Sequence, residues 1–354
     1  MPRRAIPVKT PIPPTSPSSR SRATGRVTLA DVAALAGVSP ITVSRTLRGE
    51  RTVDPALAER VRAVAAELRY MPDPAARALA SRHSSHVAVL IPMLSNALFV
   101  DLLEAVQRTL RPAGYQTLIG ITHYDPDEEE QLLREQLLHR PAGLLVTGTD
   151  HNEHTRELIA NSGVPCVHLM AHSSAPDVYC VGFSQTDAGA AITRHLLERG
   201  RKRIAFVAAQ LDPRTLQRAE GYRQALNEVG RYDPALELLD PRPSSMALGG
   251  ELLTQLLDSH PDCDAVFFCN DDLAQGGLLA ALRVGMAIPE RVAVAGFNDL
   301  SGSDQMLPPL TTVATPRGAI GEAGAQMLLT LMRGEAPVHH SVDLGFELRL
   351  RQSS

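Results

Sequence analysis

From residue 87 onward, short apolar runs rich in β-branched residues alternate with longer amphipathic segments, and this alternation limits the possible folds more than any other feature. Runs that are apolar throughout are typical of parallel strands covered by helices on both faces. The pattern extends over about 265 residues, which is too long for one compact sheet. We therefore expect an α/β core with two lobes and a cleft. The expected strands are 87–91, 115–121, 144–147, 166–170, 178–183, 204–208, 265–269 and 292–297, and the expected helices include 100–110, 188–198, 216–229 and 273–283.

Residues 28–70 follow a helical period instead. Thr28 and Asp31 have the spacing of a capping box, Gly37 supplies a sharp turn, and Ser39 is suited to cap a second helix. We therefore expect a small all-α head. Its expected helices are 29–35, with Val32, Leu35 and Ala36 on one apolar face, then 40–47, and a third that starts at residue 55.

Charge is distributed unevenly between these two parts. Residues 1–85 hold 14 Arg and Lys against 6 Asp and Glu, a balance of +8, whereas the remainder holds 21 against 33, a balance of −12. A basic head on an acidic body predicts binding to a polyanion, either nucleic acid or an anionic membrane surface. Residues 1–25 are rich in Pro, Ser and Arg and contain no acidic residue, which predicts a disordered basic arm.

The sequence also indicates a cytoplasmic protein. No apolar stretch approaches the roughly 18 residues that a membrane helix needs, and the N-terminus lacks the apolar core of a secretory signal. The four cysteines have no CxxC spacing, so we interpret them as small buried apolar residues rather than disulfides or zinc ligands. They are Cys166, Cys180, Cys263 and Cys269.

No cofactor, metal or enzymatic activity is expected. Gly318, Gly321 and Gly324 have the wrong spacing for a dinucleotide-binding loop, and His151 and His154 have no third ligand nearby in the sequence. Asp271 and Asp272 resemble a catalytic pair but serve equally well as a helix cap, and no nucleophile shares a motif with a base.

Residues 28–47 have the pattern of a helix-turn-helix, in which the first helix braces the second against the major groove of DNA. Ile41, Thr42 and Arg45 lie on the side of the second helix away from Val43, so they are the candidate base readers. Arg45 has the geometry to bind guanine with two hydrogen bonds, and Ile41 offers only apolar contact. The alternative is an ordinary helical hairpin with a surface arginine. Thr28 and Ser39 are further candidate DNA contacts.

These motifs resemble the LacI/GalR family of bacterial transcription regulators. The resemblance covers all but the first 25 residues, and within the family the chain is most similar to gluconate-utilisation repressors. The motifs of the family are 28–47, 53–55, 68–72, 181–184, 197–205, 269–272, 294–298 and 308–312, and those of the gluconate group are 211–215, 268–272 and 342–346.

The resemblance implies a homodimer that binds pseudo-palindromic operator DNA at the bacterial nucleoid, with a helix-turn-helix head joined by a hinge to a core like that of periplasmic binding proteins. In the hinge, Arg77 is a candidate DNA contact, and Leu79 would insert between base pairs from the minor groove. Alternatively, Leu79 packs within a linker helix. The implied domains are a basic arm (1–25), a DNA-binding head (26–71), a hinge and linker (72–86), an N-terminal lobe (87–184 with 314–344) and a C-terminal lobe (185–313 with 345–354).

A small-molecule effector is expected between the lobes. By resemblance its contacts fall on Asn96 and Phe99 in the first lobe and on Arg218, Asn270 and Asn298 in the second. Arg214 precedes Arg218 by four residues and lies on the same helical face if the helix has begun by that position, and His168 is a further candidate. Two arginines bind a carboxylate well while amides bind hydroxyls, which favours a sugar acid such as gluconate.

Composition and two departures from the family support an acidic effector. The chain has 7 Phe, 6 Tyr and no Trp, so few rings are available to stack on a neutral sugar. Met170 and Asn298 occupy places where relatives often carry acidic residues, so we expect less repulsion of an anion. A protonated His168 would add positive charge near Met170, but we favour a neutral histidine within a strand. The alternatives are a regulator of this family that responds to a neutral sugar or nucleoside and, more distantly, a solute-binding protein.

Overall fold

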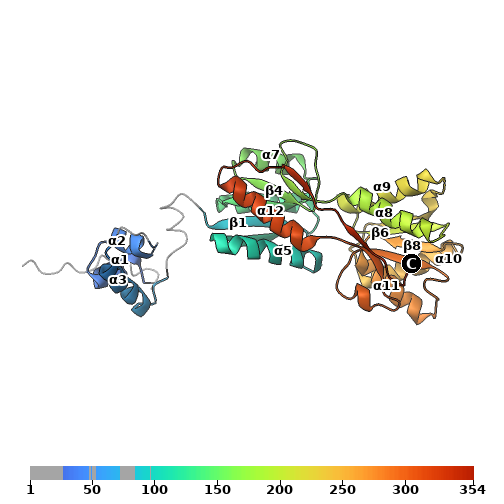
Figure 1. Ribbon diagram of the computed structural model, residues 1–354, viewed down its shortest axis with the longest axis horizontal. Helices are drawn as coiled ribbons and strands as arrows, with labels where there is room; N and C mark the ends of the chain where they lie inside the picture. The colour runs from blue at the N-terminus through green and yellow to red at the C-terminus, as the bar shows by residue number, and fades with distance from the viewer. Residues whose placement is uncertain (1–26, 48, 50–52, 72–83, 96) are drawn as a thin grey trace, which may run out of the picture. The chain divides into compact units, whose positions relative to one another are not determined.

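A computed structural model of the chain describes residues 27–47, 49, 53–71, 84–95 and 97–354. The chain divides into two compact units, Met1–Arg82 and His83–Ser354, which we describe separately as the head and the core (Figure 1). None of the helices in the described ranges combines the length and the apolar character that a membrane span requires.

The described residues of the head form three helices around a small apolar centre. They are α1 (Leu29–Ala36), α2 (Pro40–Leu47) and α3 (Pro55–Glu67). The expected capping box is confirmed, because the Thr28 hydroxyl accepts from the backbone N–H of Asp31 while the Asp31 carboxylate accepts from the backbone N–H of Thr28. Gly37 ends α1 at φ +67°, a conformation that only glycine adopts without strain. Helix boundaries in the head are therefore set by local capping and turn chemistry.

One prediction about the head is wrong. Leu35 is 56% exposed, whereas Val32 and Ala36 are buried as expected. The buried stripe of α1 passes through Ala33 instead, on the other side of Val32. In a helix of only two turns, a leucine beside the stripe cannot reach the core, and apolar character alone does not show this.

The core consists of two lobes, each built on a six-stranded sheet (Figure 1). The first sheet has the order β11-β5-β4-β3-β1-β2 and is parallel throughout, and the second has the order β12-β10-β9-β8-β6-β7 with only β12 antiparallel. The first contains β1 (His86–Ile91), β2 (Gln116–Ile121), β3 (Gly143–Thr147), β4 (Cys166–Leu169), β5 (Cys180–Gly182) and β11 (Ser341–Asp343). The second contains β6 (Ile204–Ala209), β7 (Glu237–Asp240), β8 (Ala265–Phe268), β9 (Ala293–Asn298), β10 (Thr311–Ala314) and β12 (Glu347–Arg349).

Helices cover these sheets, which confirms the predicted α/β fold of doubly wound lobes. The first lobe carries α5 (Ala97–Leu110), α6 (Pro126–Leu138), α7 (Glu153–Asn161) and α12 (Arg317–Met332), and the second carries α8 (Gln185–Glu198), α9 (Pro213–Glu228), α10 (Met246–Ser259) and α11 (Asp271–Arg283). Short 3-10 turns lie at Arg111–Ala113, Pro234–Leu236 and Ser303–Gln305. Figure 1 shows α5 and α12 side by side on the first lobe. Because α12 follows β10 in sequence, the chain returns from the second lobe to complete the first.

Four strands, β7, β10, β11 and β12, were not expected from the sequence. They are only three or four residues long, so they carry too little periodicity to be recognised. Helices α8 and α9 also begin earlier than expected. Ser184 caps α8, and Asp212 caps α9 with Pro213 at its first position. These caps, rather than the apolar pattern, determine where the helices start.

The cysteines are free thiols, as expected, and three of the four are buried. Cys166 is the half-buried one. Burial raises the pKa of Cys166 to about 12 and the pKa of Cys263 and Cys269 to about 11. A thiol reacts as the thiolate, so these side chains behave as apolar packing groups at neutral pH.

Helices α10 and α11 approach each other through glycine. A Cβ on Gly276 would overlap the backbone carbonyl of Met246, and a Cβ on Gly249 would overlap the backbone of Leu273. Because backbone atoms cannot move aside as a flexible side chain does, these two positions fix the distance between the helices.

We expect Gly276→Ala to lower the free energy of unfolding of the core by about 2 kcal/mol, because the added methyl group must push α10 and α11 apart. Gly318→Ala is the matched control, since a Cβ there meets no atom within 4 Å. It should change stability by less than about 1 kcal/mol. Urea unfolding followed by far-UV circular dichroism measures both, and equal effects of the two substitutions would contradict the close approach.

Candidate functional site

Helix α2 carries the predicted base readers on its accessible side. Ile41 is 64% exposed and Arg45 is also exposed, whereas Val43 is fully buried. Thr42 is half-buried, and its hydroxyl lies 2.9 Å from the Ser39 hydroxyl, which also accepts from the backbone N–H of Thr42 at 3.2 Å. Ser39 and Thr42 therefore define the start of α2, while Ile41 and Arg45 offer more accessible surface to a partner.

Of the other predicted DNA contacts, Thr28 is engaged in a helix cap, and the two hinge residues lie outside the described ranges. The Thr28 hydroxyl already donates to the Asp31 carboxylate at 2.7 Å, so its first role is to cap α1. Arg77 and Leu79 of the hinge lie outside the described residues, as does Asn96, the predicted effector contact in the first lobe.

A cavity of about 190 Å³ lies between the two lobes of the core. Its lining comes from segments that follow the carboxyl ends of the strands, where doubly wound sheets place their ligands. Five predicted effector residues line it, namely Phe99, Arg214, Arg218, Asn270 and Asn298. The topology thus brings together side chains that are up to 199 positions apart in the sequence.

Arg218 is a buried cation in the wall of this cavity, only 6% exposed. Its Nε donates to Gln185 Oε1 at 2.8 Å, and its Nη1 donates to the Cys269 carbonyl at 2.7 Å. The guanidinium carbon lies 4.0 Å from the ring centroid of Phe297, a distance typical of a cation–π contact. Burial lowers the pKa of Arg218, and these contacts hold its planar group in one orientation.

Arg214 spans the cavity from the second lobe to the first. Its guanidinium carbon lies 5.6 Å from the ring centroid of Phe99 and 5.9 Å from that of Tyr124, both in the first lobe. Its Nε donates to Asp212 Oδ1 at 3.1 Å. Burial raises the pKa of Asp212, but Arg214 and Arg218 outweigh this and leave the pKa below its ordinary value. Arg214 and Asp212 therefore form a charged pair inside the site.

The two predicted amides differ in how their hydrogen bonds are used. Asn270 caps α11 by accepting from the backbone N–H of Leu273 at 3.0 Å, and its Nδ2 donates to the Ser244 hydroxyl at 2.9 Å. Asn298 is 2% exposed, and its Oδ1 is buried with no hydrogen-bond partner among the described residues. A buried acceptor of this kind is costly unless a donor reaches it, and a ligand hydroxyl in the cavity would satisfy it.

The cavity contains more acidic groups than the sequence led us to expect. Met170 and Asn298 were expected to leave it short of carboxylates, yet Asp212 and Asp272 both line it. Burial raises the pKa of Asp272, while Asp212 is held ionised by its arginine partners. The site is therefore a balanced arrangement of cations and carboxylates rather than a simply positive one.

His168 does not line the cavity, contrary to expectation. Its Nδ1 lies 2.8 Å from the Gly148 carbonyl and 3.2 Å from Nε2 of His151, whose own Nδ1 lies 2.5 Å from Glu129 Oε1. Burial lowers the pKa of His168 to about 4, although the hydrogen bond to Gly148 opposes this. His168 is thus a neutral histidine within the first lobe, the alternative that its place in a strand had suggested.

Sequence reasoning missed several residues of the site, among them Tyr124, Ser244 and Asp212. Tyr124 lies in a loop at φ +62°, and no local pattern predicts that this loop faces the second lobe. Ser244 likewise comes from an irregular segment. Asp212 precedes Pro213, the signature of a helix cap, so its position could have been predicted but its charged partner could not.

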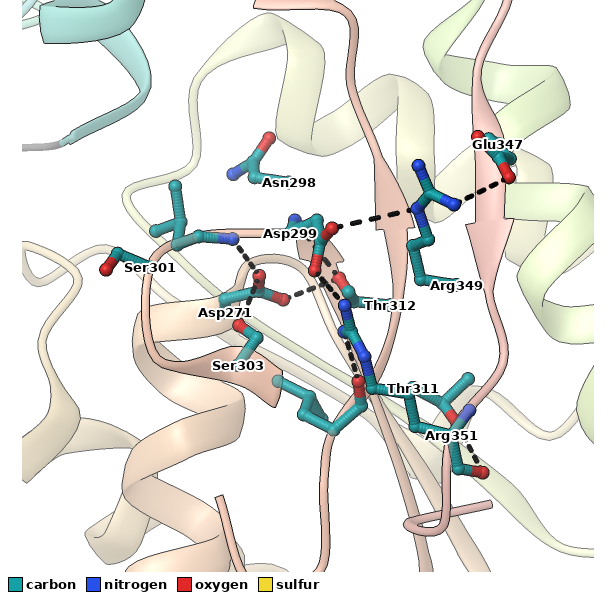
Figure 2. Close-up of polar contacts among 12 residues, drawn as sticks. Asp271, Asn298, Asp299, Ser301, Ser303, Thr311, Thr312, Glu347, Arg349 and Arg351 are labelled. Atoms are coloured by element: carbon teal, nitrogen blue, oxygen red, sulfur yellow. Dashed lines mark hydrogen bonds and ion pairs between the residues drawn. The ribbon is translucent and has the colours of Figure 1, made fainter. Parts of the chain in front are cut away.

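Buried hydrogen bonds fix the segment that carries Asn298 (Figure 2). Asp271 is fully buried and accepts from the backbone N–H of Leu300 at 2.6 Å, the Thr312 hydroxyl at 2.6 Å and the Ser303 hydroxyl at 2.9 Å. Burial raises the pKa of Asp271 to about 6, although these hydrogen bonds lower it. Asp271 therefore acts as a structural acceptor for the segment after β9, and the cap of α11 expected from Asp271 and Asp272 is supplied by Asn270 instead.

Two models of protein families match the chain. The model described as bacterial regulatory proteins, lacI family, matches residues 28–73. The model described as periplasmic binding proteins and sugar binding domain of LacI family matches residues 84–343. The two matches together span the helical part of the head and most of the core.

Named relatives resemble the chain over nearly its whole length. It is 54% identical over 340 residues to the HTH-type transcriptional regulator GntR of Pseudomonas aeruginosa, covering 96% of this chain and 99% of that protein. It is 35% identical over 323 residues to the regulator GntR of Escherichia coli K12, covering 91% of this chain and 97% of that protein.

The chain is also similar to solved structures of transcription regulators. The transcription regulator GntR from Chromobacterium violaceum is 51% identical, with a TM-score of 0.75 over 76% of this chain and 99% of that one. The lac repressor dimer bound to operator and the anti-inducer ONPF is 25% identical, with a TM-score of 0.83 over 93% of this chain and 99% of that one.

Because the pKa of His168 is lowered in the folded protein, we predict that the free energy of unfolding depends on pH. Between pH 6.5 and about pH 4 the unfolded chain binds a proton that the folded chain excludes, so stability falls as the pH falls through this window. From pH 7 to pH 5 this residue should cost about 2 kcal/mol. We expect His168→Gln to lose this part of the pH dependence in urea unfolding, whereas a substitution of the exposed His139 by Gln should keep it. A wild-type pH dependence in His168→Gln would contradict the assignment.

Proposed function

Because the chain belongs to the LacI family of bacterial regulatory proteins, we propose that it is a transcriptional repressor whose affinity for operator DNA is controlled by gluconate or a related aldonate. The head binds DNA sequence-specifically through α2. The effector occupies the cavity between the lobes of the core. The chain thus combines a DNA-reading module with a sensor for a small molecule.

The observation that carries this proposal is the pair of arginines in the cavity, one half-buried and one buried. Arg214 and Arg218 line the same space as the Asn270 and Asn298 amides. Guanidinium groups bind carboxylates with two parallel hydrogen bonds, and the unpartnered Asn298 Oδ1 accepts from a hydroxyl. The volume of about 190 Å³ is below the range of about 300–1,000 Å³ typical of drug-sized ligands, which suits a molecule as small as a sugar acid.

The proposed assembly is a homodimer on a pseudo-palindromic operator. A solved structure similar to this chain is the lac repressor dimer bound to operator. Two heads related by a two-fold axis read two half-sites in opposite directions, which matches the symmetry of such a sequence. We assign Ile41 and Arg45 to base contacts, Thr28, Ser39 and Thr42 to the DNA-facing start of the helices, and Arg77 and Leu79 to the hinge contacts.

Control by the effector requires only a modest difference in affinity. A ligand that prefers the low-affinity conformation by a few kcal/mol is enough to release the operator. In the proposed mechanism, the ligand changes the angle between the lobes and so disfavours insertion of Leu79 into the minor groove.

A neutral sugar is the alternative ligand class, and the carboxylates of the site favour it. Asp212 neutralises Arg214, and Asp272 adds a second acidic group to the lining. Calorimetric titration of the purified protein with gluconate, 2-ketogluconate, gluconate 6-phosphate and neutral hexoses distinguishes the two classes. Heat of binding with the hexoses alone would reject the sugar-acid proposal.

We expect Arg218→Met to weaken gluconate binding by at least about 100-fold, because the carboxylate loses a buried cationic partner. The matched control is Arg223→Met, because Arg223 lies on the same helix as Arg218 but outside the cavity, where it pairs with Glu237 of β7. The control should bind gluconate like the wild type, and both variants should bind operator in the absence of ligand. Normal calorimetric affinity in Arg218→Met would remove Arg218 from the site.

In the head, Arg45→Ala should relax base preference at one symmetric pair of operator positions and cost about 1–3 kcal/mol of specific binding. Selection of binding sites from random DNA measures this directly. Arg62→Ala, which removes an exposed arginine of α3, is the control and should leave the selected sequence unchanged. An unchanged consensus in Arg45→Ala would exclude Arg45 as a base reader.

A further inference from the structure

The strand end that carries Asn298 has an unfavourable backbone conformation. Asn298 has φ +109° and Asp299 has φ +52°, values that residues with a side chain rarely adopt. Two successive residues of this kind persist only where the surroundings hold them in place. The position of the Asn298 amide in the cavity therefore depends on whatever fixes this short segment.

Several contacts hold the segment from the second lobe. The Asp299 carboxylate pairs with Arg351 at 2.8 Å, and the backbone N–H of Leu300 donates to Asp271 (Figure 2). Figure 2 also shows the Asn298 side chain pointing away from the Asp271 carboxylate. These contacts hold Asp299 and Leu300, but they leave the carbonyl of Asn298 itself to other donors.

The Thr315 hydroxyl donates to that carbonyl at 3.5 Å, and the closer donor is Arg317, at the start of α12. Its Nη1 donates to the Asn298 carbonyl by a short hydrogen bond and to the Asp299 carbonyl at 3.4 Å, and its Nη2 donates to the Asp299 carbonyl at 3.4 Å. Its Nε donates to Asp101 Oδ2 at 3.0 Å. The Arg317 side chain is 16% exposed. One guanidinium thus binds both carbonyls of the strained segment and a carboxylate on α5.

These contacts connect the two lobes. Helix α12 packs on α5 in the first lobe, whereas Asn298 ends β9 in the second. Asp101 lies two residues after Phe99 of the cavity lining, on the same helix. Hydrogen bonds are short-ranged and directional, so Arg317 reaches the Asn298 and Asp299 carbonyls only when the lobes have a suitable relative orientation.

We propose that Arg317 is a positioning residue for the effector, which holds the Asn298 backbone so that the Asn298 amide faces the ligand. The proposal rests on the proposed function, because it assumes an effector in this cavity. Arg317 is outside the cavity lining and acts through Asn298 rather than by touching the ligand. Asp101 orients Arg317, and its weaker, half-exposed ion pair makes a smaller contribution.

A double-mutant cycle between Arg317→Met and Asn298→Gly tests this role. Glycine tolerates the positive φ of Asn298 and removes the amide. Calorimetry with gluconate should show at least about tenfold weaker binding for each single variant. Because Arg317 acts through the amide, the double variant should bind no more than about threefold more weakly than Asn298→Gly. Losses that multiply to about 100-fold would overturn the proposal.

Further variants separate positioning from general damage. Arg317→Lys keeps one charge but cannot bind Asp101 and both carbonyls together, so its affinity should lie between those of wild type and Arg317→Met. Arg333→Met removes an ion pair with Glu335 after the other end of α12 and should bind gluconate normally. If Arg317→Met fails to fold, Asp101→Asn replaces it in the cycle, with an expected loss of about threefold that disappears in the Asn298→Gly background.

The possible results distinguish this role from the function on which it rests. If the wild-type protein binds gluconate and Arg317→Met binds it equally well, only the role of Arg317 is overturned. If the wild-type protein binds none of the aldonates, the proposed effector class is wrong and the positioning role is overturned with it.

Discussion

The burial of a guanidinium between the two lobes governs the chemistry of the core. Arg218 has lost most of its contact with water, so the protein must replace that hydration with fixed groups. Gln185, the Cys269 carbonyl and the ring of Phe297 supply them. Each comes from a different element, so the cation restricts how these elements of the core can sit together.

The need to compensate buried positive charge also explains which residues line the cavity. Asp212 offsets the charge of both arginines, and Arg214 in turn extends over Phe99 and Tyr124 of the first lobe. A ligand entering the cavity meets charges that are already partly compensated. Selectivity then depends on geometry, meaning which donor reaches the Asn298 acceptor and which acceptor reaches the guanidinium groups, more than on net charge.

Sequence reasoning succeeded where local chemistry decides the structure and failed where tertiary contacts do. The capping box of Thr28, the turn at Gly37 and the long apolar strands depend on neighbours in the chain, so they were predictable. The surroundings of His168 were not predictable, because its contact with His151 depends on how β4 faces α6 and α7. Residues of the cavity were found mainly through family resemblance, whereas Tyr124 needs the folded arrangement of the lobes to be identified.

The buried thiols have a practical consequence for measuring motion. Burial keeps Cys263 and Cys269 protonated at neutral pH, and the chain contains no tryptophan. Cys180 is also buried, and the half-buried Cys166 has a raised pKa, so the native thiols react slowly with maleimide and the protein has no indole fluorescence. A pair of cysteines introduced on the outer faces of α7 and α10 would carry donor and acceptor dyes with little background from native thiols, so single-molecule energy transfer could follow lobe closure in a nearly unaltered protein.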